Sequence, residues 1–187
     1  MKTMTVLCSL LVAAGAVEAG QAAYIPAKAV VAQVLLDRAF VESVETGRPV
    51  RPWSWADMAP VARLSIERIG MDEIALDKGS GQAMAFGPTL LPGTAAPGQK
   101  GTSVFAAHRD THFRNLSKVR VGDVIRVEGT DGKVTEYRVS KLNVRRWNSF
   151  AISSDRTEKR LVLATCYPFG AQVRGPWRFI VEAEAVS

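Results

Sequence analysis

The stretch DVIRVEGTDGKVTEYRVS, residues 123–140, carries the plainest fold signal in this chain of 187 residues. Its two halves, 123–128 and 134–140, are built from the residue types of short strands. Between the halves lie Thr130, Asp131 and Gly132, which favour a tight turn. The stretch therefore predicts a β-hairpin.

Short strands separated by turn residues continue on both sides of this hairpin. The predicted strands are 62–67, 73–76, 103–107, 123–128, 134–140, 160–165 and 177–184. The segment from Gly87 to Gly101 is rich in proline and glycine, and we expect it to be a long ordered loop. Seven short strands within about 125 residues predict a mainly β fold. The expected architecture is a closed or nearly closed barrel of about seven to eight strands, with short helices.

The residues before the strands predict a helix and a connector. Apolar residues over 27–44 recur near helical spacing, so this range predicts a helix that precedes the barrel. A connector with Trp53 and Trp55 follows, and these rings either lie at a membrane interface or pack against the domain. We expect the helix and connector to occupy 24–60 and the folded domain to occupy 61–187.

The first 23 residues predict export. Lys2 is followed by a run of 14 residues without a charge, 4–17, which ends at Glu18. This pattern fits a cleaved signal peptide. It also fits an uncleaved signal anchor if the span continues to Tyr24, although the run is short for a full span of about 20 residues. Both alternatives export the rest of the chain.

Composition excludes several classes of protein. Apolar residues make up 47% and charged residues 22% of the chain, which is typical of a globular protein and not of a disordered one. The net charge is +6, but the basic residues are scattered and aromatic residues are few, so we expect no nucleic-acid partner. Cys8 and Cys166 are the two cysteines. A disulfide framework and a multi-cysteine zinc site are therefore excluded.

Export would leave Cys166 as a lone thiol in an oxidising compartment, because Cys8 lies in the apolar segment. Such a thiol is either a nucleophile or a small buried apolar residue. Cys166 directly follows the predicted strand 160–165. Two other strand ends carry reactive groups: His108 and His112 follow strand 103–107, and Arg178 lies at the start of the last strand.

Cys166, His108 and Arg178 are the residue types that acyl transfer needs. An unassisted thiol is mostly protonated at neutral pH, so a neighbouring imidazolium favours the thiolate, and the imidazole can then protonate a leaving amine. A guanidinium stabilises a developing oxyanion without titrating. His108 and Cys166 are 58 residues apart, so the sequence alone does not establish that they meet.

These segments together resemble the sortases, the cysteine transpeptidases that join surface proteins to cell envelopes. The resemblance rests on Ala107-His108-Arg109-Asp110-Thr111-His112-Phe113 combined with Thr165-Cys166-Tyr167-Pro168-Phe169 and a following arginine, and it covers about residues 63–186. Residues 52–57, Pro-Trp-Ser-Trp-Ala-Asp, resemble the proteobacterial, Gram-negative branch. Ala107 stands where the family commonly has glycine, and Ala164 also departs from the pattern, but both changes leave the reactive groups intact.

The resemblance implies a role for each reactive group. Cys166 is expected to be the nucleophile, His108 the general acid/base, and Arg178 the residue that positions substrate and stabilises the oxyanion. Arg174 is the rival arginine. His112 is expected to be structural or to form part of the rim.

Two supporting residues keep open alternatives. Thr165 either orients the arginine or the substrate, or is simply a β-branched strand residue. Asp110 either orients a histidine or caps the turn that follows. No metal or organic cofactor is implied, and no acidic cluster argues for calcium.

The resemblance also implies a substrate and a location. The expected substrate is an exported protein with a C-terminal LPxTG-like sorting signal, which passes through a thioester acyl-enzyme to an unidentified amine. The expected location is the inner membrane with the catalytic domain in the periplasm, or the soluble periplasm after signal cleavage. Two alternatives remain: an exported cysteine hydrolase with the same Cys/His pair, and a non-catalytic envelope scaffold.

Overall fold

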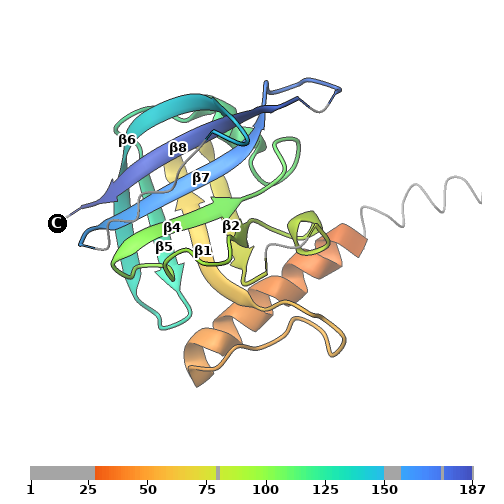
Figure 1. Ribbon diagram of the computed structural model, residues 1–187. Helices are drawn as coiled ribbons and strands as arrows, with labels where there is room; N and C mark the ends of the chain where they lie inside the picture. Colours follow the sequence, from red (N-terminus) through yellow and green to blue (C-terminus); the bar gives the residue numbers. More distant parts are fainter. Residues whose placement is uncertain (1–27, 79–80, 150–156, 174, 187) are drawn as a thin grey trace, which may run out of the picture.

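The computed structural model describes residues 28–78, 81–149, 157–173 and 175–186, and these residues form a β-barrel with a helix along its side (Figure 1). The barrel closes in the strand order β1-β2-β3-β4-β7-β8-β6-β5. The strands are β1 (Pro60–Ile66), β2 (Met71–Leu76), β3 (Thr89–Leu90), β4 (Gly101–Ala106), β5 (Val124–Gly129), β6 (Val134–Arg146), β7 (Lys159–Tyr167) and β8 (Trp177–Ala185). Short 3-10 helices occupy η1 (Glu67–Ile69), η2 (Ala83–Ala85) and η3 (Arg114–Lys118). The predicted mainly β, closed barrel is therefore confirmed.

The strand that the sequence did not predict is β3, which lies inside the segment 87–101 that was expected to be a loop. Thr89 pairs in parallel with Leu76 of β2, and Thr89 and Leu90 pair with the end of β4. A strand of two residues is too short to show an alternating pattern, so its sequence looks like the loop around it. These few pairs nevertheless join β2 to β4 and so close the barrel.

The predicted hairpin is formed by β5 and β6. The two strands pair antiparallel, with Ile125 opposite Tyr137. The amide of Gly132 donates a 3.0 Å hydrogen bond to the carbonyl of Gly129 and closes the turn. Gly132 has a φ of 72°, in the left-handed region that favours glycine. Beyond the hairpin, β6 runs six residues further than predicted because it continues along β8 as far as Arg146.

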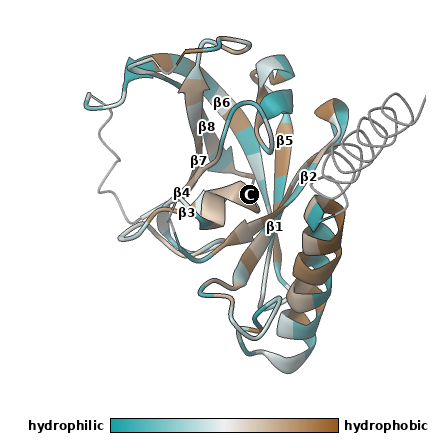
Figure 2. Ribbon diagram, turned by 90° about the vertical axis from the view of Figure 1, so that its right-hand side faces the viewer, coloured by the Kyte–Doolittle hydropathy of each residue, from teal (hydrophilic) through white to brown (hydrophobic). Residues whose placement is uncertain are grey.

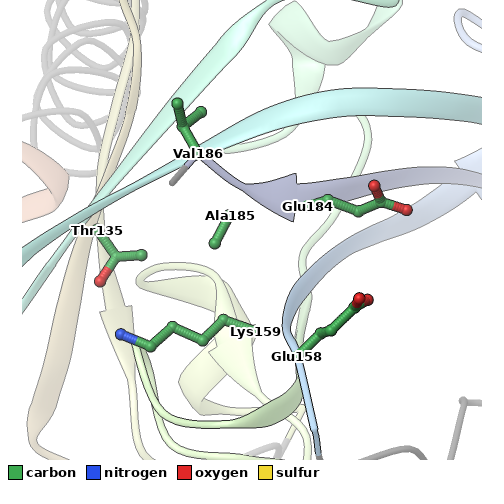
Figure 3. A pocket seen from close by; sticks show the side chains of 6 residues that line it. All are labelled: Thr135, Glu158, Lys159, Glu184, Ala185 and Val186. Carbon is green, nitrogen blue, oxygen red and sulfur yellow. The ribbon is translucent and has the colours of Figure 1, made fainter.

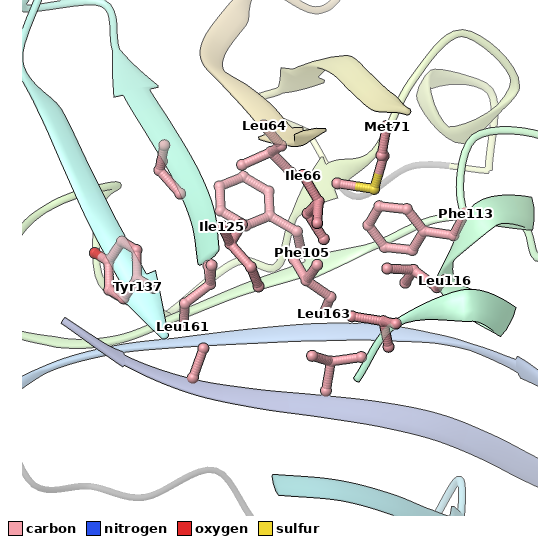
Figure 4. Close-up of a cluster of buried hydrophobic side chains, with 14 of the residues drawn as sticks. Leu64, Ile66, Met71, Phe105, Phe113, Leu116, Ile125, Tyr137, Leu161 and Leu163 are labelled. Atoms are coloured by element: carbon pink, nitrogen blue, oxygen red, sulfur yellow. The ribbon is translucent and has the colours of Figure 1, made fainter. Parts of the chain in front are cut away.

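The core fills the inside of the barrel with large apolar side chains (Figure 4). Because side chains alternate along a strand, Leu161 and Leu163 of β7 point into this core. Val162 lies on the opposite, outer face, where it packs with Val104 of β4 and Ile180 of β8 in a separate apolar cluster. The outer face of β4, β7 and β8 is therefore apolar as well.

The helix packs against the barrel beside β1 and β2 (Figure 2). It covers residues 28–46 of the described chain, close to the predicted 27–44. Leu36 and Phe40 pack against Ile74 and Leu76 of β2, and burial of these side chains stabilises the contact.

The connector after the helix also packs against the domain through one of its tryptophans. The ring of Trp53 meets the ring of Phe86 edge to face, with centroids 5.2 Å apart, whereas Trp55 is 83% exposed. Of the two alternatives for these rings, Trp53 therefore shows packing against the domain. Within the described residues, no helix is long and apolar enough to cross a membrane. The apolar segment predicted over 1–23 lies outside those residues.

Candidate active site

The ends of three strands bring the predicted reactive residues to one end of the barrel (Figure 1). Strands β4 and β7 run parallel, and their last paired residues are Ala106 and Ala164. His108 and Cys166 each follow that pair by two residues. Strand β8 runs antiparallel to β7, which sets Arg178, its second residue, directly opposite Cys166. Residues that are far apart in the sequence therefore lie on neighbouring strand ends.

Alternation along the strands sets Cys166 and Arg178 on the outer face of the barrel. Ala164, two residues before Cys166, and Ile180, two residues after Arg178, both belong to the outer apolar cluster. Cys166 is a free thiol and is half-buried, and His108 is exposed. The thiol and the imidazole are therefore accessible from solvent.

The guanidinium of Arg178 is held by the chain at the start of β8 and just before it. Its Nη1 donates hydrogen bonds to the carbonyl oxygens of Gly175, at 3.0 Å, and Trp177, at 2.9 Å. Its Nε and Nη2 have no hydrogen-bond partner among the described residues. Those N–H groups are available to an acceptor on a bound substrate. The rival Arg174 lies outside the described residues.

Thr165 links the cysteine strand to the histidine segment. Its side chain is buried, and its hydroxyl donates a 2.7 Å hydrogen bond to the carbonyl oxygen of Ala107. The backbone amide of Ala107 in turn donates to the carbonyl of Ala164, at 3.3 Å. The hydroxyl thus contacts the residue that directly precedes His108, a contact that neither alternative from the sequence had specified.

Asp110 contacts an arginine in the described structure. Each of its carboxylate oxygens lies 3.2 Å from Nε of Arg109, the neighbouring residue. Arg109 is 5% exposed, and its guanidinium also donates to the carbonyl oxygens of Pro168, at 2.7 Å, and Ala171. Sequence reasoning did not select Arg109, because an arginine in a polar segment is usually solvated. Its partners Pro168 and Ala171 lie about 60 residues away in the sequence.

His112 is tied to β2 and η2. Its Nδ1 lies 2.6 Å from a carboxylate oxygen of Glu73, and its Nε2 lies 3.5 Å from the carbonyl oxygen of Ala85. Burial acts to lower the pKa of His112, but the hydrogen bond and charge of Glu73 outweigh it and raise that pKa above its ordinary value. These contacts hold the ring of His112 against β2 and η2.

A cavity of about 540 Å³ lies at the other end of the barrel (Figure 3). It is lined by Glu158, Lys159, Glu184 and three smaller residues. Lys159 is the first residue of β7 and Cys166 the eighth, so about 20 Å of strand separates this cavity from the thiol. The cavity therefore does not belong to the site at Cys166. Within the described residues, no three His, Cys, Asp or Glu side chains come together as a metal site.

Comparison with known proteins identifies the family. A model of the sortase domain matches residues 64–186. Sortase D of Bacillus subtilis (strain 168) is 31% identical over 91 residues, which are 49% of this chain and 46% of that protein. This match thus spans about half the length of the curated relative.

Solved sortase structures share the fold. The Sortase D5 transpeptidase of Clostridium perfringens superimposes with a TM-score of 0.69 at 22% identity, over 84% of this chain and 99% of that one. Sortase A from Corynebacterium diphtheriae superimposes with a TM-score of 0.63 at 24% identity, over 71% of this chain and 63% of that one. The family model covers most of the described barrel, from within β1 to the end of β8. The chain therefore belongs to the sortase family.

Proposed function

We propose that this protein is a sortase-type cysteine transpeptidase. The observation that carries the proposal is the register of β7 and β8, which pairs the free thiol of Cys166 with the guanidinium of Arg178. His108 lies at the same end of the barrel, two residues past the end of β4. A nucleophile, a proton donor and an oxyanion donor at one accessible rim are what acyl transfer from a peptide requires.

The proposed reaction has two halves. In the first, the sulfur of Cys166 attacks the carbonyl carbon of the scissile peptide bond, and the Nε–H and Nη2–H groups of Arg178, which bond to none of the described residues, hold the oxygen as it gains negative charge. The C–N bond then breaks, and His108 gives a proton to the leaving amine. In the second half, His108 accepts a proton from an incoming amine that attacks the thioester carbonyl. The new amide forms and Cys166 leaves as its thiolate.

The proposed substrate is an exported protein with a C-terminal LPxTG-like sorting signal, and the acceptor is a primary amine. Membership of the sortase family supports this substrate class. An exported cysteine hydrolase is the second candidate. Cys166 is only half-buried, so water can reach a thioester formed on it and hydrolyse it. A non-catalytic envelope scaffold predicts instead that Cys166 is unreactive.

We also propose that the chain is exported, on the basis of the apolar run over 4–17. An uncleaved segment would anchor it in the inner membrane with the barrel in the periplasm, and cleavage would leave a soluble periplasmic enzyme. The proposed branch, that of the proteobacterial sortases, rests on the sequence of residues 52–57.

A thioester trap tests the proposed function. Wild type and Cys166→Ala are incubated with candidate sorting peptides, with and without a primary amine, and the intact masses are measured. We expect an acyl adduct on wild type, none on Cys166→Ala, and an amine-linked product when the amine is present. Free acid as the sole product, whatever the amine concentration, would favour the hydrolase. An unreactive Cys166, with peptide cleavage surviving in Cys166→Ala, would refute both enzymatic candidates.

A matched pair of variants tests the role of Arg178. Arg145 of β6 lies directly opposite Arg178 on its other side and is exposed, so it carries the same charge on a neighbouring strand. Arg178→Met is expected to slow thioester formation by about 100-fold, the usual effect of losing an oxyanion donor. Arg145→Met is expected to change it by about twofold or less. Equal losses in the two variants would mean that general positive charge, and not an oxyanion contact, is what matters.

A further inference from the structure

Arg109 is a charged side chain buried beside the candidate active site. It directly follows His108 in the chain and is 5% exposed. Each nitrogen of its guanidinium has a partner: Nε faces the carboxylate of Asp110, Nη1 donates to the carbonyl oxygen of Pro168, and Nη2 donates to that of Ala171. The guanidinium therefore connects the segment after β4 to the segment after β7.

The two segments that Arg109 connects are the ones that carry the proposed general acid/base and the proposed nucleophile. Pro168 lies two residues after Cys166, and Ala171 lies five residues after it, beyond the last paired residue of β7. Neither carbonyl belongs to the strand ladder, so the ladder does not fix the chain there. The planar fork of the guanidinium fixes both carbonyls at once.

The histidine side of this connection is also rigid. The amide of Phe113 donates a 3.1 Å hydrogen bond to the carbonyl oxygen of His108, and the ring of Phe113 is fully buried in the barrel core. Because Arg109 directly follows His108, a movement of the Arg109 backbone would also move His108.

Fold stability is a poor explanation for this arrangement. Removing a guanidinium from water costs several kcal/mol, and the one carboxylate beside Arg109 in the described part of the chain belongs to Asp110, whose side chain is 64% exposed. The other partners are neutral carbonyls. An apolar side chain of similar volume would fill the space without this cost, as is often found when buried charges are replaced. What an apolar side chain cannot do is hold two carbonyls of the β7–β8 connection.

We propose that Arg109 is a positioning residue that locks the His108 segment to the chain following Cys166, and so sets the approach of the imidazole to the thiol. This inference rests on the proposed function of the Cys166–His108 pair. The expected consequence is that loss of the fork leaves the barrel folded but uncouples the histidine from the cysteine.

A double-mutant cycle between His108 and Arg109 tests the inference. The rate of alkylation of Cys166 by iodoacetamide at pH 7 is measured in the full chain, with the Cys8 and Cys166 peptides followed separately by mass spectrometry. His108→Ala is introduced into wild type, into Arg109→Lys, which keeps the charge but loses the fork, and into Arg109→Met, which removes the charge and keeps most of the volume. Arg114→Lys is the matched control, because Arg114 is exposed and bonds the carbonyl of Asp110 but no described residue of the β7–β8 connection.

In wild type and in Arg114→Lys, we expect His108→Ala to slow the alkylation of Cys166 by about tenfold, because the thiol loses the neighbouring imidazole that assists its reaction. In both Arg109 variants, we expect His108→Ala to add a change of about twofold or less, since the histidine is already uncoupled. With a sorting peptide, both Arg109 variants should lower kcat by about tenfold or more and leave KM within about twofold. Thermal melting of every variant verifies that each is folded at the assay temperature.

A full tenfold effect of His108→Ala in a folded Arg109 variant would overturn the inference, because the two substitutions would then be independent. Absence of any effect of His108→Ala in wild type would overturn both the inference and the proposed Cys/His pair. Failure of every sorting peptide with the coupling intact would count against the transpeptidase function alone, because the alkylation cycle needs no substrate.

Discussion

Replacing Thr165 by valine measures how much the active-site end of the barrel depends on one hydroxyl. Thr165 is 2% exposed, and its Oγ1 donates a 2.7 Å hydrogen bond to the carbonyl oxygen of Ala107. Valine has nearly the same shape but carries a methyl in place of the hydroxyl. The carbonyl of Ala107 therefore loses this donor, and no water can take its place without a local opening of the structure.

The expected cost follows from the burial of this hydrogen bond. A hydrogen bond contributes about 0.5–1.5 kcal/mol net, and a buried acceptor left without its partner costs about 1–3 kcal/mol. We expect Thr165→Val to lower the free energy of unfolding by about 1–2 kcal/mol, which for a chain of this size lowers Tm by about 2–8 °C. Thr165→Ser keeps the hydroxyl and loses one buried methyl, at a cost of about 1 kcal/mol.

The two variants have similar expected stabilities but different expected activities. Because His108 directly follows Ala107, Thr165→Val should lower kcat for thioester formation by about tenfold through displacement of the histidine. Thr165→Ser should keep kcat within about twofold of wild type, since the hydroxyl is retained. Urea unfolding followed by circular dichroism gives the stabilities, and the thioester trap gives kcat. Equal kcat values for the valine and serine variants, or a valine variant as stable as wild type, would refute the reasoning.

Three further predictions concern stability, each measured by urea unfolding. Burial acts to lower the pKa of His112, but Glu73 raises it overall. The pair of His112 and Glu73 therefore stabilises the fold below the ordinary histidine pKa, and this stabilisation is lost as pH rises through the pKa of the folded state. Glu73→Gln should therefore cost about 1 kcal/mol at pH 5 and less at pH 9, and equal costs would contradict this. A hydrogen bond from Arg68 of η1 lowers the pKa of Asp123 against the opposing effect of desolvation. The pair therefore stabilises the fold above the ordinary carboxyl pKa, and this stabilisation is lost as pH falls through the pKa of the folded state. The deficit of Asp123→Asn should then shrink between pH 6 and pH 3, and a constant deficit would contradict it. A Cβ on Gly87 would lie 2.4 Å from a backbone oxygen of β2, so Gly87→Ala should cost about 1–3 kcal/mol, whereas Gly81→Ala, with open space around it, should cost less.

The sequence predicted the barrel well because most of its strands carry their own signal. Each of the seven predicted strands overlaps an observed one, and the turn at Gly132 closes the expected hairpin. Strand β3 was missed because Thr89 and Leu90 are held in place by β2 and β4 and have no local pattern of their own. The extension of β6 to Arg146 was missed for a related reason: its partner is β8, which lies some 30 residues further along the chain.

The candidate site was likewise predictable from the sequence only in part. Cys166 and Arg178 stand at recognisable strand ends, and the register of β7 and β8 brings them opposite each other. The burial of Arg109 had no local signal, because its partners at Pro168 and Ala171 are 59 and 62 residues away. The contact between Thr165 and Ala107 likewise spans 58 residues. Contacts across the tertiary structure, and not local propensity, determine what these two side chains do.

Because of the order of strands in the barrel, backbone hydrogen bonds between strands hold some residues of the candidate site but not others. β7 lies between a parallel neighbour, β4, and an antiparallel neighbour, β8. The antiparallel ladder continues past Cys166 as far as Tyr167, so backbone hydrogen bonds fix the relation of Cys166 to Arg178. The parallel ladder ends at Ala106 and Ala164, two residues before His108.

The position of His108 therefore depends on contacts beyond the ladder. Two of them are side-chain attachments, the hydroxyl of Thr165 on one side and the guanidinium of Arg109 on the other, and they add to the backbone hydrogen bonds from Ala107 to Ala164 and from Phe113 to His108. In the proposed reaction, the nucleophile Cys166 and the oxyanion donor Arg178 lie within paired strands, whereas the general acid/base His108 lies in the segment that follows β4. Substitutions that weaken these two attachments should thus lower kcat while the barrel remains folded. Substitutions in the barrel core should instead reduce stability first, because the core side chains hold the barrel itself together, and neither Thr165 nor Arg109 is one of them.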